Sequence, residues 1–138
     1  MSDQVVAKPM PEPTPDTQPY WDGLRARKLL IQSCASCGKL RFYPRPMCDA
    51  CYSMDSTWIE ASGNGTVHSW TVTHHPFHAG FKGEVPYILA TVDLAEGVRL
   101  NAQVRGIERD ALQMGLPVKV GFEAGADGLN LPVVKPTG

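Results

Sequence analysis

The stretch CASCGKLRFYPRPMCDAC, residues 34–51, contains all four cysteines of this 138-residue chain. They form two matched pairs, Cys34 with Cys37 and Cys48 with Cys51, and two residues separate the members of each pair. A tight turn of this kind places two thiolates on one side of the backbone. Two such turns facing each other supply the four sulfur ligands of a tetrahedral zinc site. The spacing therefore predicts a zinc ribbon.

The alternative interpretations of these cysteines are two disulfides or four unrelated buried thiols. The regular spacing of both pairs favours zinc binding over both alternatives. Four thiolates close the coordination sphere, which indicates a structural metal and not a catalytic one. Gly38 follows the first pair and suits the turn, whereas Tyr52 occupies the equivalent place after the second. The same site could hold iron in a free-standing rubredoxin-like electron carrier, which a colourless protein would exclude.

Positive charge is concentrated around the cysteines, although the net charge of the chain is only −1. Residues 23–48 contain no acid, whereas residues 1–22 and 49–138 are both net acidic. The basic residues of the central segment are Arg25, Arg27, Lys28, Lys39, Arg41 and Arg45. Two interpretations remain open: these charges balance the formal −2 of a zinc tetrathiolate, or they bind phosphates.

The length and composition predict one small domain, or a metal-stapled unit joined to a compact barrel. No apolar run reaches membrane-spanning length, and the N-terminus lacks the layout of a signal peptide. Reduced, metal-bound thiols are typical of a reducing compartment. We therefore expect a cytoplasmic protein that does not bind membranes.

The N-terminal part divides into an arm and a ribbon unit. Residues 1–18 are rich in proline, which predicts a flexible arm. Residues 20–28 predict a short helix with Trp21, Leu24 and Lys28 on one face. Strands are expected at 29–31, before the first cysteine pair, and at 40–43, between the pairs. We thus assign residues 19–57 to a helix plus zinc ribbon, which metal binding would help to stabilise.

From Trp58 onward the apolar residues alternate with period two, and glycines mark the turns. Strands are expected at 66–73, 87–94, 98–104, 117–122 and 131–134, with a short helix at 108–112. A helix between the third and fourth of five strands matches the OB-fold barrel. The fold class is therefore mainly β, with residues 58–138 forming a five-stranded OB barrel.

Many short segments of the chain also resemble, in the right order, a family of small zinc-ribbon/OB-fold proteins associated with acyl-CoA enzymes, the domain of unknown function thirty-five. The resemblance covers residues 19–136. The matching segments are 20–24, 30–34, 37–38, 44–45, 48–51, 63–67, 85–87, 96–100, 114–118 and 131–133.

This resemblance implies a helical N-terminal hairpin, a rubredoxin-like zinc ribbon and a C-terminal OB barrel. It also implies a small partner of thiolase-fold enzymes, either thiolases or aldolases, that act on CoA thioesters in the degradation of lipids or aromatic acids. We accordingly expect a hetero-oligomer that has no catalytic activity alone and that shapes or covers the acyl-CoA site. The cysteine nucleophile that thiolases use would come from the partner, because the four thiols here are committed to metal.

Several basic residues are candidates for binding the phosphates of coenzyme A, because the guanidinium fork suits phosphate oxygens. This assignment comes from the charge distribution and not from the family pattern. Arg41 and Arg45, fixed next to the cysteine pairs, are the preferred candidates. The others are Arg25, Arg27 and Lys28.

The loop at 74–84 carries three of the four histidines. Adjacent histidines on an extended segment point to opposite faces, which argues against a second metal site. The loop could instead reach an acyl chain or a partner through Phe77, His78 and Phe81, or it could be a plain solvent loop. Tyr20 and Trp21, beside the basic segment, are candidate interface anchors.

The alternative interpretation is that the chain is a nucleic-acid-binding module, because ribbons and OB barrels both bind nucleic acids. Against it, the barrel segment is net acidic, and its aromatic residues are not interleaved with lysine or arginine. We therefore expect acyl-CoA and a protein partner instead of nucleic acid. Steeply salt-dependent retention on single-stranded DNA would favour the alternative.

Overall fold

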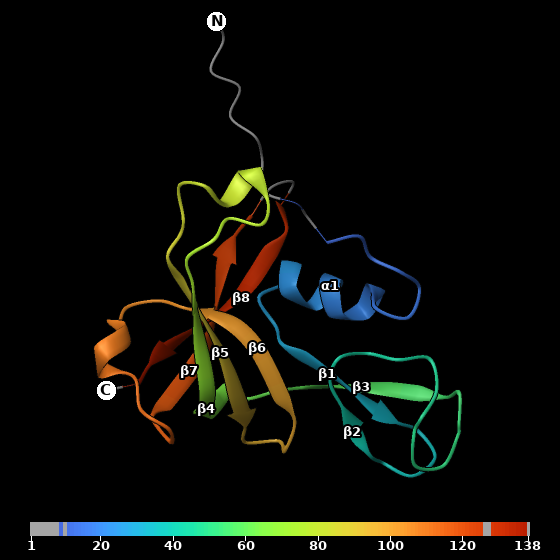
Figure 1. Cartoon of the computed structure of the whole chain (residues 1–138). Helices are drawn as coiled ribbons and strands as arrows, with labels where there is room; N and C mark the ends of the chain where they lie inside the picture. The colour runs from blue at the N-terminus through green and yellow to red at the C-terminus, as the bar shows by residue number, and fades with distance from the viewer. Residues whose placement is uncertain (1–8, 10, 126–127, 138) are drawn as a thin grey trace, which may run out of the picture.

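Two β-sheets and a short helix account for most of the computed structural model, which describes residues 9, 11–125 and 128–137 (Figure 1). The ribbon and the barrel lie side by side, and the helix packs between them. In chain order the elements are α1 (Gln18–Arg25), β1 (Leu30–Cys34), β2 (Leu40–Arg41), β3 (Ser56–Glu60), β4 (Asn64–Thr73), the 3-10 turn η1 (Ala79–Phe81), β5 (Tyr87–Leu94), β6 (Arg99–Val104), η2 (Arg109–Ala111), β7 (Pro117–Ala124) and β8 (Asn130–Pro136). The mainly β fold class is confirmed.

Helix α1 ends three residues earlier than the sequence predicts. The N–H of Arg27 donates to the carbonyl of Leu24 at 3.0 Å, and the N–H of Lys28 donates to that of Gly23 at 2.8 Å. This pair of bonds is the Schellman arrangement, with Arg27 in the left-handed conformation at φ 59°. Lys28 therefore lies beyond the helix and does not share a helical face with Trp21, which corrects that prediction.

The end of the proline-rich arm is tied down just before α1. The hydroxyl of buried Thr17 accepts hydrogen bonds from the Thr14 N–H at 2.9 Å and from the Trp21 indole N–H at 3.1 Å. These bonds fix a turn at 14–17. The part of the predicted flexible arm at residues 1–8 and 10 lies outside the described residues.

The ribbon sheet has the order β2-β1-β3. Strand β1 pairs with β2 through Gln32 opposite Arg41, and with β3 from Leu30 opposite Glu60 to Cys34 opposite Ser56. The predicted boundary between residues 57 and 58 thus falls inside β3. A period-two pattern alone does not tell which sheet a strand joins, because both sheets bury alternate residues.

The second sheet closes into a five-stranded barrel, as predicted, and its strand order is β4-β5-β6-β8-β7. Strand β7 returns to β4, with Asn64 opposite Lys119, and β6 pairs with β8 in parallel. The interior of the barrel is filled by apolar side chains, among them the buried Val67, Val92 and Val134. The barrel is thus a packed core, and ligands must bind outside it.

Gly65 in β4 offers a test of the barrel register. A Cβ added there would lie 2.7 Å from the carbonyl oxygen of Asp93 and 2.7 Å from a methyl of Val92. We expect Gly65→Ala to lower the free energy of unfolding by about 1–3 kcal/mol in urea denaturation, because the backbone must shift. Gly121→Ala is the control, since the nearest atom to its Cβ would be a Val133 methyl at 3.9 Å. Equal urea midpoints for the two variants would contradict this register.

Candidate functional site

The four cysteines converge at the tip of the ribbon. Their sulfur atoms all lie within 4.8 Å of one another. Sγ of Cys34 lies 3.5 Å from that of Cys51, and Sγ of Cys37 lies 3.6 Å from that of Cys48. A tetrahedron with Zn–S bonds of about 2.3 Å has sulfur–sulfur edges of about 3.8 Å. The donor set and its dimensions therefore fit a zinc ion, as predicted, and all four thiols are free of disulfides.

The two cysteine turns have the same backbone closure. The N–H of Gly38 donates to the Cys34 carbonyl at 2.9 Å, and the N–H of Tyr52 donates to the Cys48 carbonyl at 3.0 Å. Both donors adopt positive φ, 77° for Gly38 and 64° for Tyr52. A side chain in this conformation costs about 1–2 kcal/mol. The metal site therefore has to hold Tyr52 in a conformation that its side chain disfavours.

Backbone N–H groups favour thiolates in this site. The N–H of Cys37 lies 3.4 Å from Sγ of Cys34, and together with the Ser36 N–H it lowers the pKa of that thiol to about 6. The N–H groups of Cys51 and Ala50 lower the pKa of the Cys48 thiol, and the Ala50 N–H lies 3.4 Å from its Sγ. At Cys51 the Ser53 N–H acts in the same direction, but the neighbouring thiols raise the pKa to about 12. Because zinc binds thiolates and not thiols, these bonds favour metal binding at neutral pH.

Arg41 lies inside the ribbon and not on its surface, which corrects its proposed role at a phosphate. Its side chain is only 6% exposed. Its Nε donates to Oε1 of Gln32 at 2.6 Å, and its Nη2 donates to the Arg45 carbonyl at 3.2 Å. The backbone N–H of Arg45 donates to the same Gln32 oxygen at 2.8 Å. Arg41 and Gln32 thus hold the turn between the cysteine pairs.

Gln32 is a polar residue that the sequence interpretation missed, and it gives a stability prediction. We expect Gln32→Ala to lower the free energy of unfolding by about 1–3 kcal/mol, because Arg41 and the Arg45 N–H lose their shared acceptor in a buried place. Gln18→Ala should change it by less than about 0.5 kcal/mol, since Gln18 is exposed and bonds only Asp22 at its side chain. Chemical denaturation measures both, and a neutral Gln32→Ala would contradict the assignment.

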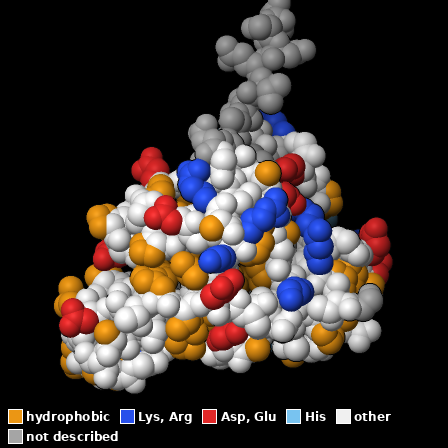
Figure 2. Space-filling view, turned by 180° about the vertical axis from the view of Figure 1, so that it is seen from behind, with side chains coloured by type: hydrophobic (Ala, Val, Ile, Leu, Met, Phe, Trp, Pro, Cys, Tyr) orange, Lys and Arg blue, Asp and Glu red, His pale blue; other side chains and the backbone are white. Residues whose placement is uncertain are grey.

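The other basic candidates are exposed: Arg25, Arg27, Lys28 and Arg45. Three of them lie in the last turn of α1 and the residues after it. Arg25 also reaches the β7–β8 loop, where its Nη1 would lie 3.3 Å from a Cβ on Gly128. Lys39 pairs instead with Asp49 at 2.8 Å across the two cysteine turns. Figure 2 shows Lys and Arg side chains gathered over part of the rear face, with acidic side chains between them.

Tyr20 and Trp21 are core residues, which corrects their assignment as interface anchors. They are 3% and 8% exposed. The Tyr20 ring makes edge contacts with Trp21, Phe42 and Tyr43 at centroid distances of 4.8–5.5 Å. Burial raises the pKa of the Tyr20 hydroxyl. This aromatic cluster fastens α1 to the turn that follows β2. Tyr43 at 42% exposure is its outermost member.

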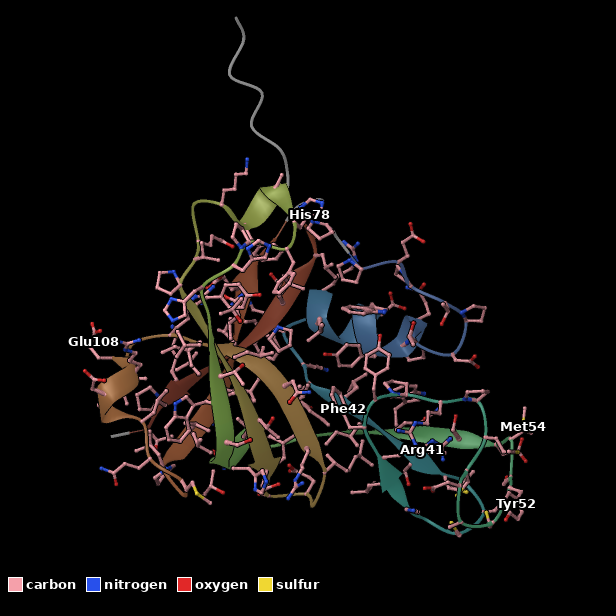
Figure 3. The ribbon with its side chains drawn as sticks, viewed as in Figure 1. Arg41, Phe42, Tyr52, Met54, His78 and Glu108 are labelled. Carbon is pink, nitrogen blue, oxygen red and sulfur yellow. The ribbon has the colours of Figure 1, made fainter. Side chains whose placement is uncertain are left out.

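The three candidate residues of the histidine-containing loop, Phe77, His78 and Phe81, differ in their exposure and contacts. Phe77 is 86% exposed and contacts only the His75 ring among the aromatic pairs of the described residues. His78 uses Nδ1 to accept from the Gly80 N–H at 2.9 Å, which caps η1 (Figure 3). Phe81 is half-buried and lies 5.7 Å from the Tyr87 ring. Within the described chain, only the four cysteines are grouped closely enough to share a metal.

A cavity of about 620 Å³ lies at the base of this loop, on the β5–β6 side of the barrel. No sequence pattern predicts this cavity, because it arises where two strands separate. Its walls come from the two ends of the loop, the start of β5, the end of β6 and the segment around η2.

No α-helix among the described residues has the length and apolar character needed to cross a membrane.

Comparison with known domain families matches both halves of the chain. Residues 21–55 match the rubredoxin-like zinc ribbon domain of ChsH2, and residues 58–123 match the C-terminal OB-fold domain of ChsH2. Together these matches run from α1 into β7, so they include the four cysteines and most of the barrel.

Three curated relatives illustrate the range of similar proteins. A probable enoyl-CoA hydratase alpha subunit of Thermomonospora curvata is 40% identical over 94% of this chain, which spans 40% of that relative's length. A DUF35 domain-containing scaffold protein of Pyrococcus furiosus is 35% identical over 73% of this chain and 74% of its own. The benzoylsuccinyl-CoA thiolase subunit BbsA of Geobacter metallireducens is 35% identical over 64% of this chain and 52% of its own.

Among solved structures, the chain superimposes on one from a structure described as "Ltp2-ChsH2(DUF35) aldolase" with a TM-score of 0.86. The identity is 39%, and the match covers 94% of this chain and all of the other. A DUF35-family protein from Sulfolobus solfataricus has the same fold, with a TM-score of 0.61 and 20% identity.

Proposed function

This chain belongs to the DUF35 family, and from that premise we propose that it is a non-catalytic, zinc-binding subunit of a thiolase-fold enzyme, a thiolase or an aldolase, in acyl-CoA metabolism. The observation that carries the proposal is the match to the whole of a DUF35 chain in an aldolase structure. The similarity to a subunit of a CoA-thioester thiolase supports the same role. The chain spans only two fifths of the hydratase alpha subunit, so no hydratase activity is carried over.

The arrangement of the thiols supports a non-catalytic role. All four sulfur atoms face one another in a closed set that leaves no coordination position for a substrate. A thiolase reaction needs a cysteine nucleophile, which the partner subunit would supply. In this account the ribbon supports α1 and the basic residues after it, and the zinc ion would give that ribbon its stability.

The exposed basic residues at the end of α1 and on the ribbon are the better candidates for the phosphates of coenzyme A. Arg25 is the last residue of α1, and Arg27 and Lys28 follow it directly. Arg45 is exposed on the ribbon. Calorimetric titration of CoA into the reconstituted complex should show at least about tenfold weaker binding for Arg27→Ala/Lys28→Ala. The double variant Lys119→Ala/Lys135→Ala, which removes two exposed lysines of the barrel, should bind normally. Unchanged CoA affinity in the first variant would remove these residues from the site.

The partner role itself is tested by reconstitution. The thiolase-fold subunit encoded in the same host should be soluble and active towards its acyl-CoA only when it is co-expressed with this chain. The expected result is co-elution of the two chains at a mass larger than either, together with thioester turnover. Full turnover by the partner alone, with no co-elution, would contradict the proposal.

A further inference from the structure

The cavity beside the histidine-containing loop marks a place where two barrel strands part. Strand β5 stays paired with β4 as far as Thr73 opposite Tyr87. Its pairing with β6 stops earlier, at Leu89 opposite Gln103. Pairing of β6 with β8 begins at the same residue, with Gln103 opposite Val133, and continues at Val104 opposite Val134. No strand of the described residues therefore pairs with the β6-facing edge of β5 at residues 87–88.

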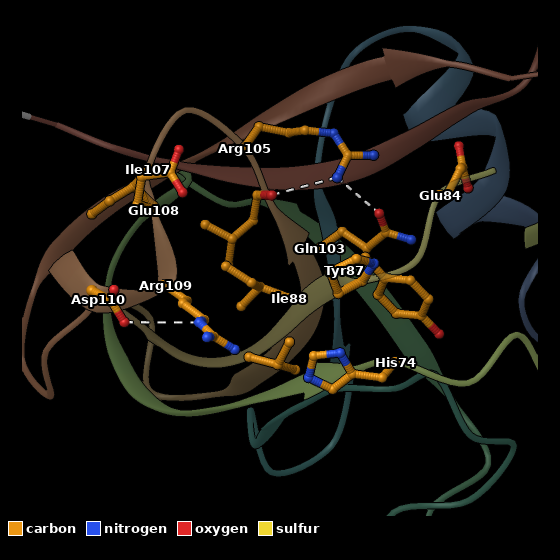
Figure 4. A pocket seen from close by; sticks show the side chains of 13 residues that line it. His74, Glu84, Tyr87, Ile88, Gln103, Arg105, Ile107, Glu108, Arg109 and Asp110 are labelled. Carbon is orange, nitrogen blue, oxygen red and sulfur yellow. Dashed lines mark hydrogen bonds and ion pairs between the residues drawn. The ribbon is translucent and has the colours of Figure 1, made fainter. Parts of the chain in front are cut away.

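The gap between the two strands holds the 620 Å³ cavity, a volume within the usual range for binding sites. Ile88 lies at the centre of the cavity, with Arg105 on one side and His74 on the other (Figure 4). Val72 and Ile107 add apolar wall. The cavity thus combines an apolar floor with an open strand edge, which is the pair of features that an added β-strand uses.

The charges around this cavity favour a basic occupant. The acids Glu84, Glu108 and Asp110 line it, against Arg105 and Arg109, and Asp110 already pairs with Arg109 at 3.8 Å. Arg105 is already neutralised by Glu123, with bonds of 2.8 and 2.9 Å to its two carboxylate oxygens, and it also donates to Gln103 at 2.8 Å. The cavity is therefore net negative, which opposes phosphate groups and nucleic acid.

We propose that the open edge of β5 at Tyr87 and Ile88 binds an extended segment of a partner polypeptide, with an apolar side chain over Ile88 and a basic side chain towards Glu108. Backbone hydrogen bonds to β5 would give the affinity, and alternate side chains would give the specificity. This inference rests on the proposed function, because it requires that the chain has a protein partner. It does not require that the main contact with that partner lies at the edge of β5.

The first test uses the full chain labelled with ¹⁵N and the probe peptide Ac-Lys-Val-Lys-Val-Lys-NH2. Titration should shift the amide signals of Tyr87, Ile88 and Ile107. The matched peptide with glutamate in place of lysine should bind at least about tenfold more weakly. The lysine peptide methylated on every backbone nitrogen should not bind, since it cannot donate hydrogen bonds to β5.

The second test reverses the charge at the rim. Glu108→Lys/Asp110→Lys changes two exposed side chains, so the fold should be retained. In this variant the glutamate peptide should bind more tightly than the lysine peptide. No shift at Tyr87 and Ile88, equal binding of the methylated peptide, or shifts of these amides by CoA or single-stranded DNA would each overturn the proposal. Co-elution with the thiolase-fold subunit despite such a result would leave the proposed function standing.

Discussion

Removal of zinc by a chelator should unfold the ribbon and leave the barrel folded. The ribbon sheet has only three strands, and β2 has two residues, so the apolar area that it buries is small. A structural zinc site contributes about 10–16 kcal/mol, more than such a sheet can replace. The strand pairs of the barrel lie within 64–136 and include no ribbon residue.

The measurement is an amide NMR spectrum before and after metal removal, with the zinc content determined in parallel. Signals of β1, β2 and β3 should lose their dispersion, while those of β4 and β5 should keep it. Cys48→Ser should reproduce the loss, because Cys48 is a buried ligand. Ser36→Ala is the control, since it removes only a surface hydrogen bond of 2.9 Å to Ser53. A dispersed ribbon in zinc-free protein would contradict the assignment of the metal as structural.

Leu24→Ala should destabilise the chain by about 2–5 kcal/mol, because it leaves a cavity where α1 meets the barrel. Leu24 is fully buried and belongs to the core cluster that includes both ribbon and barrel residues. The same helix turn is fixed to the barrel by Asn130, whose amide donates to the Leu24 carbonyl at 2.9 Å. The helix therefore cannot easily move to fill the cavity, and we expect a destabilisation in the upper part of this range.

Leu89→Ala provides the matched control for this substitution. Leu89 is 38% exposed on β5, so its truncation should change the free energy of unfolding by less than about 1 kcal/mol. Thermal and urea denaturation of both variants give the comparison. If Leu24→Ala were as mild as Leu89→Ala, α1 would not be part of the common core.

The metal site and the barrel could be predicted because each has a local sequence signature. The paired cysteines specify a turn by their own spacing, and alternation with glycine turns specifies strands. The roles of single polar residues could not be predicted in this way. Arg41 and Arg45 look alike in a charge pattern, but only Arg41 is buried, because Gln32 on the neighbouring strand accepts its hydrogen bond.

Contacts between distant segments account for the other differences. Tyr20 and Trp21 are covered by Phe42 and Tyr43, which follow more than twenty residues later. The cavity depends on where the pairing of β5 with β6 ends, and that register is decided by the closure of the barrel and not by either strand alone. The helix end was missed because Arg27, a residue with good helix propensity, adopts the left-handed conformation.

Native mass spectrometry of the tagged chain, purified from its own host without chelators, tests whether the chain is a zinc-binding subunit of a thiolase-fold enzyme. We expect a complex that contains this chain with one zinc ion and a thiolase-fold subunit. After gentle dissociation, the released chain should still carry the mass of the metal. A chain that appears only by itself, or only with other copies of itself, would contradict this role.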